Sequence, residues 1–372
     1  IYQVFHLANT YMVGLVGLAE FVPAVLAALY SGHYIDRHNK KNILVWAYVF
    51  YFLCGITLAI ISLTQLGLNV QLKVSIILTV VFCTGIIRSF AGPSANSMIP
   101  AIVPKINLPK AISYNSSTWL ISSITGHAFG GLLIAGFGIS NAYVVTAVSI
   151  LIAILLALKL KPKPPSLTNT KEDVFTSIKQ GFSYVYNNKN LLGVISLDLF
   201  AVLFGGAVAF IPEVAEKILR TGPIGYGFLN AAMDLGSLVS ILILLWFPMK
   251  KKQGLKMMLS VAGFGICIVA FGFAKVYWLS FIALAIAGFF DGVSVVIRGT
   301  IAQLQTPDEL RGRVASINLI FINSSNELGQ FESGITSKYM GTIPAIIFGG
   351  VMSIGVVVFS WFKFPSLRKM KY

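Results

Sequence analysis

Long apolar runs separated by short polar segments make up almost the whole chain. The runs cover residues 11–31, 42–63, 111–135, 142–158, 191–211, 226–247, 255–274, 276–301, 314–339 and 343–362, with one more beginning near residue 72. Each is about as long as a helix that crosses a bilayer core of roughly 30 Å. Uninterrupted apolar runs of this kind are typical of helices, whereas barrel strands alternate apolar and polar positions. The pattern predicts an all-α integral membrane protein.

A polar stretch at residues 159–190 divides these runs into two sets. It holds three prolines and six lysines, which indicates a cytoplasmic linker, with a short amphipathic helix expected over residues 171–186. The predicted domains are therefore an N-terminal helical half (1–158), the linker (159–190) and a C-terminal helical half (191–372). We interpret the apolar residues up to Ala8 as the outer end of a first helix that is mostly missing, followed by a turn at Asn9 and Thr10. This gives twelve helices, six in each half.

A short internal repeat relates the two halves. Residues 104–115 read PKINLPKAISYN, and residues 307–318 read PDELRGRVASIN. Both segments stand directly before the fifth helix of their half. Two six-helix halves related by a parallel repeat are typical of secondary transporters.

Composition agrees with a membrane protein and limits the classes of function. Hydrophobic residues make up 56% of the 372 residues, charged residues only 11%, and the mean hydropathy is +0.81. Most of the 28 lysines and arginines fall in segments predicted to be cytoplasmic, so the net charge of +15 follows the positive-inside rule and requires no nucleic acid. The three cysteines lack metal-ligand spacing, and no nucleotide-binding motif is present. We expect no cofactor, with a proton gradient as the source of energy.

One basic segment between two apolar runs carries a family signature. Residues 32–41 read GHYIDRHNKK. They resemble the loop between helices 2 and 3 of the major facilitator superfamily, with matches at Gly32, Asp36, Arg37, Lys40 and Lys41. Asn39 stands where that family has glycine, and asparagine tolerates the left-handed backbone that glycine would adopt there. The residues alone leave open a gating loop or a basic loop that only sets topology.

Four further segments resemble one branch of that superfamily, the enterobactin-exporter and macrolide-efflux type of drug–proton antiporter. They are residues 197–207, 222–227, 306–314 and 324–329. The resemblance implies the major facilitator fold. It also implies that Asp36 reaches toward the start of helix 11, the run at residues 314–339, and holds the cytoplasmic side closed. Asp234 departs from the pattern, because relatives tend to have Ala-Pro at that place. The second half has a lysine run at 250–252 in place of an Asp-Arg copy of the signature.

Ionisable side chains inside the apolar runs are the candidate functional residues, because charge at membrane depth is costly. Glu20 fits either a proton carrier or a fixed partner of Arg88. Asp198 fits a helix cap or a water-facing group better than a coupling residue. Asp291 and Arg298 are seven residues apart on one helix face, which predicts that they pair through water or another helix. The remaining candidates are His127 (packing or proton relay), Asp234, Glu327 and Glu332.

Helix 11 is the most polar of the predicted spans. A polar face at membrane depth survives only toward a water-filled cavity or another helix. We therefore expect this face to line the substrate cavity, with Asn323, Asn326, Glu327, Gln330 and Glu332 as its candidate residues.

The predicted function is secondary active transport by alternating access, with proton-coupled efflux of a siderophore or an amphiphilic drug-like molecule. An importer or an uncoupled facilitator of the same fold remains an alternative. A membrane-embedded enzyme is the alternative from another class, but no nucleophile–base or metal spacing supports it. The expected partners are a small-molecule substrate, protons and lipid, without nucleic acid. We expect a monomer that crosses the inner (cytoplasmic) membrane several times.

Overall fold

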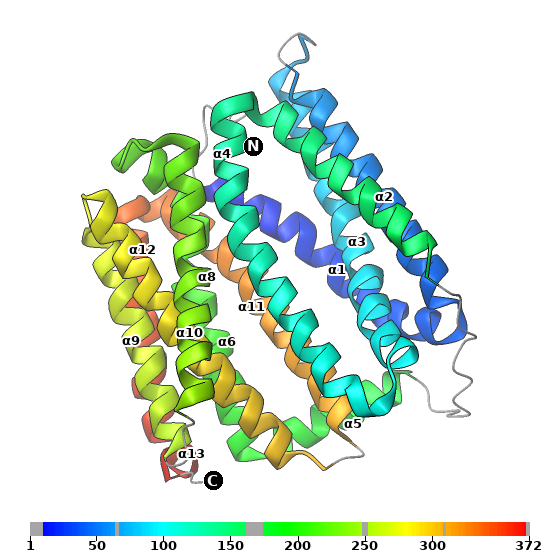
Figure 1. The fold of residues 1–372 in the computed structure, drawn as a ribbon. Coiled ribbons are helices and arrows are strands. Elements are labelled where there is room, and N and C mark those ends of the chain that lie inside the picture. The colour runs from blue at the N-terminus through cyan, green and yellow to red at the C-terminus, as the bar shows by residue number, and fades with distance from the viewer. Residues whose placement is uncertain (1–9, 64–66, 161–173, 248–251, 308–309, 370–372) are drawn as a thin grey trace. The chain divides into compact units, whose positions relative to one another are not determined.

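The computed structural model describes residues 10–63, 67–160, 174–247, 252–307 and 310–369 (Figure 1). Every regular element in these ranges is a helix. The long helices are α1 (Thr10–Arg37), α2 (Lys40–Ile61), α3 (Val70–Ile102), α4 (Leu108–Leu158), α5 (Val174–Asn187), α6 (Lys189–Gly205), α8 (Gly222–Trp246), α9 (Gln253–Phe273), α10 (Tyr277–Gln305), α11 (Arg311–Met340) and α12 (Thr342–Lys363). The short elements are η2 (Lys105–Asn107), η3 (Ala207–Ala209), α7 (Ile211–Glu213), the π-helical η4 (Val214–Ile218) and α13 (Pro365–Lys369). The all-α prediction is confirmed.

Nine helices in the described residues are long and apolar enough to span a membrane. One of them, α4, contains two of the predicted spans, because its backbone breaks at Gly138 (φ 80°, ψ 165°), a conformation that favours glycine. Another helix, α11, has 30 residues and is too polar to be counted among the nine. Together these make the eleven predicted runs. The expected remnant of a first helix lies outside the described residues.

Two predicted helix ends are wrong. The segment expected to be a loop after Ser31 continues α1 as far as Arg37. The backbone of Asn39 is extended, with φ −68° and ψ 109°, and not left-handed as the signature's glycine would be. Its side chain accepts a hydrogen bond from the Lys41 backbone N–H at 3.0 Å. It therefore caps the N-terminus of α2. Pro100, expected in the following loop, lies inside α3.

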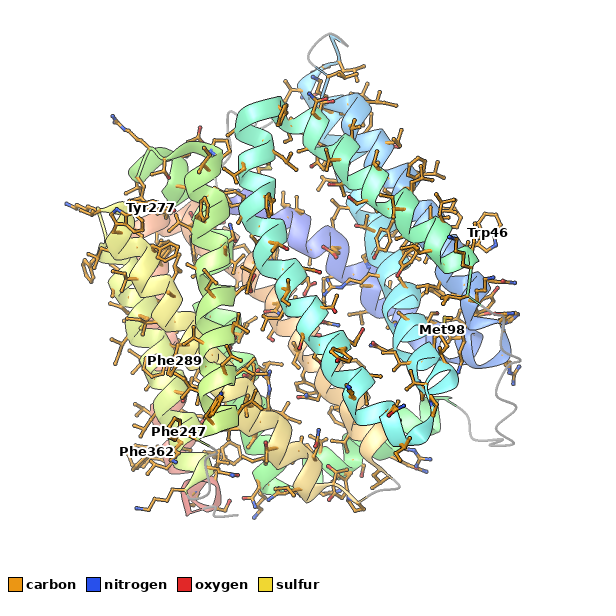
Figure 2. All side chains as sticks on the ribbon, viewed as in Figure 1. Trp46, Met98, Phe247, Tyr277, Phe289 and Phe362 are labelled. Atoms are coloured by element: carbon orange, nitrogen blue, oxygen red, sulfur yellow. The ribbon has the colours of Figure 1, made fainter. Side chains whose placement is uncertain are left out.

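The chain forms two compact units, of which the first holds residues 18–122 and 132–174. In this unit α2 packs along α3 through a small cluster of Ala47, Ile87 and Ala91. The second part of α4 packs on α2, where the Ser140 hydroxyl donates to the Ala59 carbonyl oxygen at 2.9 Å. Large apolar side chains such as Trp46, 62% exposed, point outward from α2, as a lipid-facing surface requires (Figure 2).

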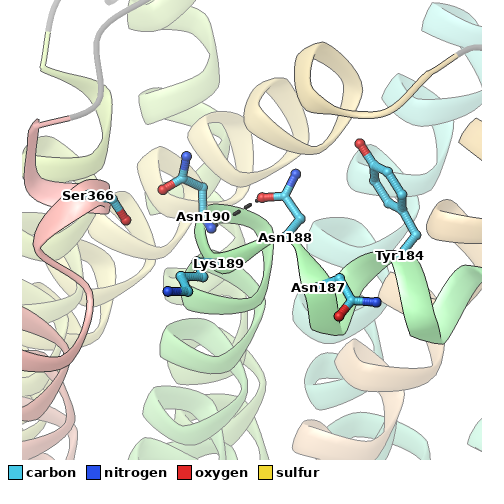
Figure 3. Close-up of a pocket in the computed structure, with 6 residues that line it drawn as sticks. All are labelled: Tyr184, Asn187, Asn188, Lys189, Asn190 and Ser366. Atoms are coloured by element: carbon cyan, nitrogen blue, oxygen red, sulfur yellow. Dashed lines mark hydrogen bonds between the residues drawn. The ribbon is translucent and has the colours of Figure 1, made fainter.

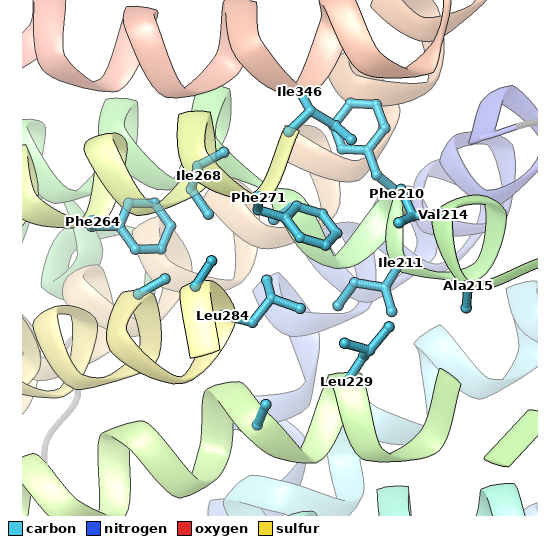
Figure 4. Packing of buried hydrophobic residues seen from close by; sticks show 14 of the residues in the cluster. Phe210, Ile211, Val214, Ala215, Leu229, Phe264, Ile268, Phe271, Leu284 and Ile346 are labelled. Atoms are coloured by element: carbon cyan, nitrogen blue, oxygen red, sulfur yellow. The ribbon is translucent and has the colours of Figure 1, made fainter. Parts of the chain in front are cut away.

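The second unit holds residues 10–17 and 123–131 together with residue 175 onward. Helices α1 and α4 are therefore each divided between the two units. The largest apolar cluster of this unit gathers fully buried side chains from α7 to α12 (Figure 4), including Phe210, Ile211, Leu229, Phe271, Leu284 and Ile346. The domain boundaries at residues 158 and 191 stay a prediction.

Candidate functional site

An ion pair joins two spanning helices of the first unit. Arg88 Nη1 of α3 lies 3.0 Å from Glu20 Oε1 of α1, and the two side chains remain 44% and 30% exposed. Of the two roles predicted for Glu20, the pairing with Arg88 is present in the structure, and the role of proton carrier stays a prediction. A guanidinium stays charged at every relevant pH, so Arg88 is the fixed charge of the pair.

A close helix crossing places this pair. A Cβ built on Gly85 would overlap the Glu20 carbonyl oxygen and lie 3.0 Å from Pro23 Cγ, so only glycine fits there. Arg88 follows Gly85 by three residues and lies on the same face of α3. Pro23 leaves no backbone N–H for an α-helical hydrogen bond at this point of α1. The crossing therefore places the guanidinium of Arg88 beside the carboxylate of Glu20, at the same level along α1.

A polar cluster joins α4 and α8 in the second unit. Asp234 Oδ2 accepts a hydrogen bond from Ser123 Oγ at 2.7 Å and lies 2.9 Å from His127 Nδ1. Ser123 and His127 are four residues apart, so both project from one face of α4. The His127 side chain is 46% exposed and that of Asp234 is 23% exposed. Two separate sequence candidates thus form a single cluster, which we call the α4–α8 cluster.

Two facing glycines hold this cluster in place. A Cβ on Gly131 would lie 2.6 Å from the Pro223 carbonyl oxygen, and one on Gly227 would lie 2.6 Å from the His127 carbonyl oxygen. The backbones of α4 and α8 are therefore in direct contact. Close crossings at glycine are typical of helix packing in membranes.

A second ion pair lies in the interior of the second unit. Arg298 of α10 binds Asp198 of α6, and both side chains are only 7% exposed. Asp198 therefore neither caps a helix end nor faces water, contrary to that prediction. Arg298 pairs directly with Asp198, and its predicted pairing with Asp291 through water stays a prediction. Asp291 lies instead on the wall of a small cavity beside Asp198. It also interacts electrostatically with Asp234.

The polar residues of α11 differ in how far they are buried. Asn323 and Asn326 are exposed, whereas Glu327 is buried and Glu332 is partly buried. Gln330 contacts α1, because its Cβ lies 3.2 Å from the position of a Cβ on Gly17. Of the predicted cavity face, two asparagines are exposed and Gln330 belongs to a helix contact. Cavity lining by these residues stays a prediction.

Comparison with known proteins places the chain in a family. A family model described as transmembrane secretion effector matches residues 6–371. The chain belongs to this family. An enterobactin exporter, EntS of Shigella boydii serotype 4, is 26% identical over 313 residues, which cover 82% of this chain and 72% of that protein. EntS of Escherichia coli O81 is 27% identical over the same shares of the two chains.

Solved structures confirm the fold of the chain. A D-xylose–proton symporter matches with a TM-score of 0.77 at 15% identity and covers 98% of this chain and 90% of its own. A bacterial homologue of the human lysosomal transporter Spinster matches with a TM-score of 0.72 at 14% identity and covers 97% and 89%. With the family match, these establish a multi-pass membrane transporter of the major facilitator fold, of the enterobactin-exporter type.

The side chains of the signature segment, residues 32–41, are only partly described. Lys41 Nζ donates to the Leu158 carbonyl oxygen at 2.7 Å, so this lysine stabilises the end of α4. Gly32 and Arg37 are exposed, and Lys40 is partly exposed. The side chain of Asp36 and residues 308–309 lie outside the described part. The expected contact of Asp36 with the start of helix 11 therefore stays a prediction.

Two residues in polar contacts were missed by the sequence analysis. Ser123 belongs to the α4–α8 cluster, and its four-residue spacing from His127 was the available signal. Glu213 of α7 accepts hydrogen bonds from the Thr10 backbone N–H at 2.9 Å and hydroxyl at 2.5 Å, and it pairs with Lys217 at 2.9 Å. The four-residue spacing of Glu213 and Lys217 indicated a helical turn in a segment that we interpreted as a loop.

A cavity of the second unit lies away from these groups. It has a volume of about 480 Å³ and is lined by Tyr184, Asn187, Asn188, Lys189, Asn190 and Ser366, where α5, α6 and α13 meet (Figure 3). None of the predicted site residues lines it. No group of three or more possible metal ligands occurs among the described residues.

Proposed function

We propose that the chain is a secondary exporter of the inner membrane, which acts as a monomer and moves a siderophore or a similar amphiphilic molecule outward in exchange for protons. The observation that carries this proposal is the pair of partly exposed charged contacts inside spanning helices, Glu20 with Arg88 and Asp234 with His127. Polar groups at membrane depth face water or protein, and they mark ion and substrate paths. The kinship with enterobactin exporters supports a siderophore as cargo.

Proton binding at Glu20 supplies a coupling step. A proton on this carboxyl group removes its negative charge and weakens its bond to the Arg88 guanidinium. The guanidinium keeps its charge and its planar donors, which suit the anionic oxygens of a siderophore. The ionised carboxyl group of Glu20 holds the guanidinium in the position where it binds cargo, so a proton on Glu20 frees the guanidinium from that position and lowers its affinity for cargo. Proton and cargo therefore exclude each other on the protein, as exchange requires. Competition of this kind links the two fluxes.

Alternating access requires contacts that separate without unfolding a helix. Residues 10–17 of α1 lie along α11, where a Cβ on Gly14 would be 2.8 Å from the Gln330 carbonyl oxygen. Residues 123–131 of α4 lie along α8 at Gly131 and Gly227. Both contacts consist of backbone against backbone at small residues, with few interlocked side chains. We propose that these two crossings form the outer gate. The polar contacts of the α4–α8 cluster would stabilise its closed form.

Transport in oriented proteoliposomes tests this function. Vesicles are loaded with iron-free siderophores or amphiphilic dyes, and export is followed with and without an imposed inward proton gradient. We expect gradient-driven export of at least one cargo, lost in Glu20→Gln and kept in Glu216→Gln. The second variant is the matched control, because Glu216 lies in η4 and outside both charged contacts.

The same assay separates the alternatives. Uptake in place of export would identify an importer of the same fold. An export rate that does not depend on the proton gradient would identify an uncoupled facilitator, in which Glu20 is a structural partner of Arg88. Either result refutes proton-coupled efflux.

A further inference from the structure

A small cavity lies among α6, α9 and α10 of the second unit. Its volume is about 10 Å³, which corresponds to the space that one water molecule needs. Its polar lining comes from Asp198, Asp291 and Ser294, and the rest of the lining is apolar. A buried water is stable when two to four polar groups surround it. The cavity therefore has the size and the number of partners that hold a single water.

The serine gives independent evidence for an occupant. Ser294 is 2% exposed, and its Oγ makes no hydrogen bond with any residue that the structure describes. A buried hydroxyl without a partner is costly, and most such groups in proteins are satisfied by protein or by ordered water. The hydroxyl of Ser294 lines the cavity, so its partner is expected there.

The charges around the cavity leave one carboxyl group in excess. Asp198 from α6 is balanced by Arg298. Asp234 from α8 is bound by His127 and Ser123. Within the described residues, Asp291 has no ion-pair partner, and the cavity residues of α9, Val261 and Phe264, carry no charge. Asp291 is partly buried and lies beside a second carboxylate in this cavity, and a carboxyl group without a cation in such a place takes up a proton in preference to staying ionised.

We propose that one water in this cavity joins Asp291 to Asp198 and Ser294, and that Asp291 is the proton-binding carboxyl group of the second unit. In the transfer step, the Asp291 O–H gives its proton to the water, and the water gives one of its own protons to the Asp198 carboxylate. Asp291 then carries the negative charge. Asp198 is now neutral, so its ion pair with Arg298 is lost. The use of this proton in transport rests on the proposed function, whereas the protonated state of Asp291 does not.

Infrared spectroscopy of the purified protein in lipid tests the site directly. The carbonyl stretch of a protonated carboxylic acid is resolved from that of a carboxylate. We expect such a band in the wild type, lost in Asp291→Asn and kept in Glu216→Gln, because Glu216 lies in η4 and does not line the cavity. Ser294→Ala removes one polar partner of the water and leaves both carboxyl groups of the cavity in place. It should shift the band to higher frequency because the bridging water is held less well. This variant covers the case in which Asp291→Asn fails to fold.

Two outcomes overturn the proposal. One is a spectrum in which neither Asp291→Asn nor Ser294→Ala changes the band. The other is a band that disappears on addition of sodium at constant pH, which would make the occupant a metal cation. The spectra need neither cargo nor a gradient. A wild-type band without proton-driven export would therefore refute the proposed function alone, and proton-driven export with an unchanged band in both variants would refute this inference alone.

Discussion

Two neighbouring glycines of α4 provide a sharp test of the α4–α8 crossing. A Cβ at Gly131 would lie 2.6 Å from the Pro223 carbonyl oxygen, whereas one at Gly130 meets nothing within 4 Å. An ordinary contact begins at 3.4 Å, so Gly131→Ala requires a separation of about 0.8 Å (3.4 minus 2.6). The same shift would lengthen the 2.9 Å contact of His127 with Asp234 to about 3.7 Å, beyond hydrogen-bond range.

The free-energy cost follows from this overlap. Overpacking by one methyl group costs about 1–3 kcal/mol. If this cost falls on the closed crossing, the open form gains roughly 5- to 150-fold in population relative to the closed one. Gly130→Ala adds a methyl group in open space and improves helix propensity by up to about 1 kcal/mol, so it should leave the crossing closed.

Thiol labelling of an Asn230→Cys variant measures the opening. Asn230 is 6% exposed and lies on α8 between Gly227 and Asp234. In a chain with its three native cysteines replaced, a membrane-impermeant maleimide should react faster with the thiol introduced at this position after Gly131→Ala. Gly130→Ala should leave the rate unchanged. Equal rates in the two variants would refute the view that backbone contact holds α4 against α8.

Three further changes test the fold and the site. Asp198→Asn leaves Arg298 as a buried cation without its carboxylate and should cost about 3–5 kcal/mol, seen as a lower melting midpoint in detergent; an unchanged midpoint contradicts this. Gly85→Ala places a Cβ against an α1 carbonyl oxygen and should abolish gradient-driven export, whereas Gly92→Ala in the same helix meets open space and should retain it. Equal activity of these two variants would contradict the role given to the α1–α3 crossing. Asn39→Ala removes the cap of α2 and should cost about 1 kcal/mol in a denaturant titration, and no measurable loss would show that the cap is dispensable.

The positions of the helices followed from the sequence, because the thickness of a bilayer fixes how long an apolar run must be. The break of α4 at Gly138 was expected for the same reason, since residues 108–158 are too many for one crossing. The helix ends were less predictable. Pro100 was interpreted as a loop residue, but spanning helices tolerate proline where neighbouring groups satisfy the freed backbone.

The candidate charged residues could be named from the sequence, but most of their partners could not. Spacing along one helix tells which residues share a face, and it suggested Asp291 for Arg298. The partner came instead from α6, because the rotation of each helix toward its neighbours depends on contacts between helices. In the same way, His127 and Asp234 are 107 residues apart and meet only through the glycine crossing.

Paired measurement of cargo and proton movement tests the central claim most directly. Vesicles that contain the protein, a pH-sensitive dye and an iron-free siderophore start without any pH gradient. Proton-coupled exchange predicts that export of the siderophore down its own gradient drives protons inward, so that the interior becomes more acidic, and that Glu20→Gln abolishes this signal. Siderophore export without any change of internal pH would contradict the account.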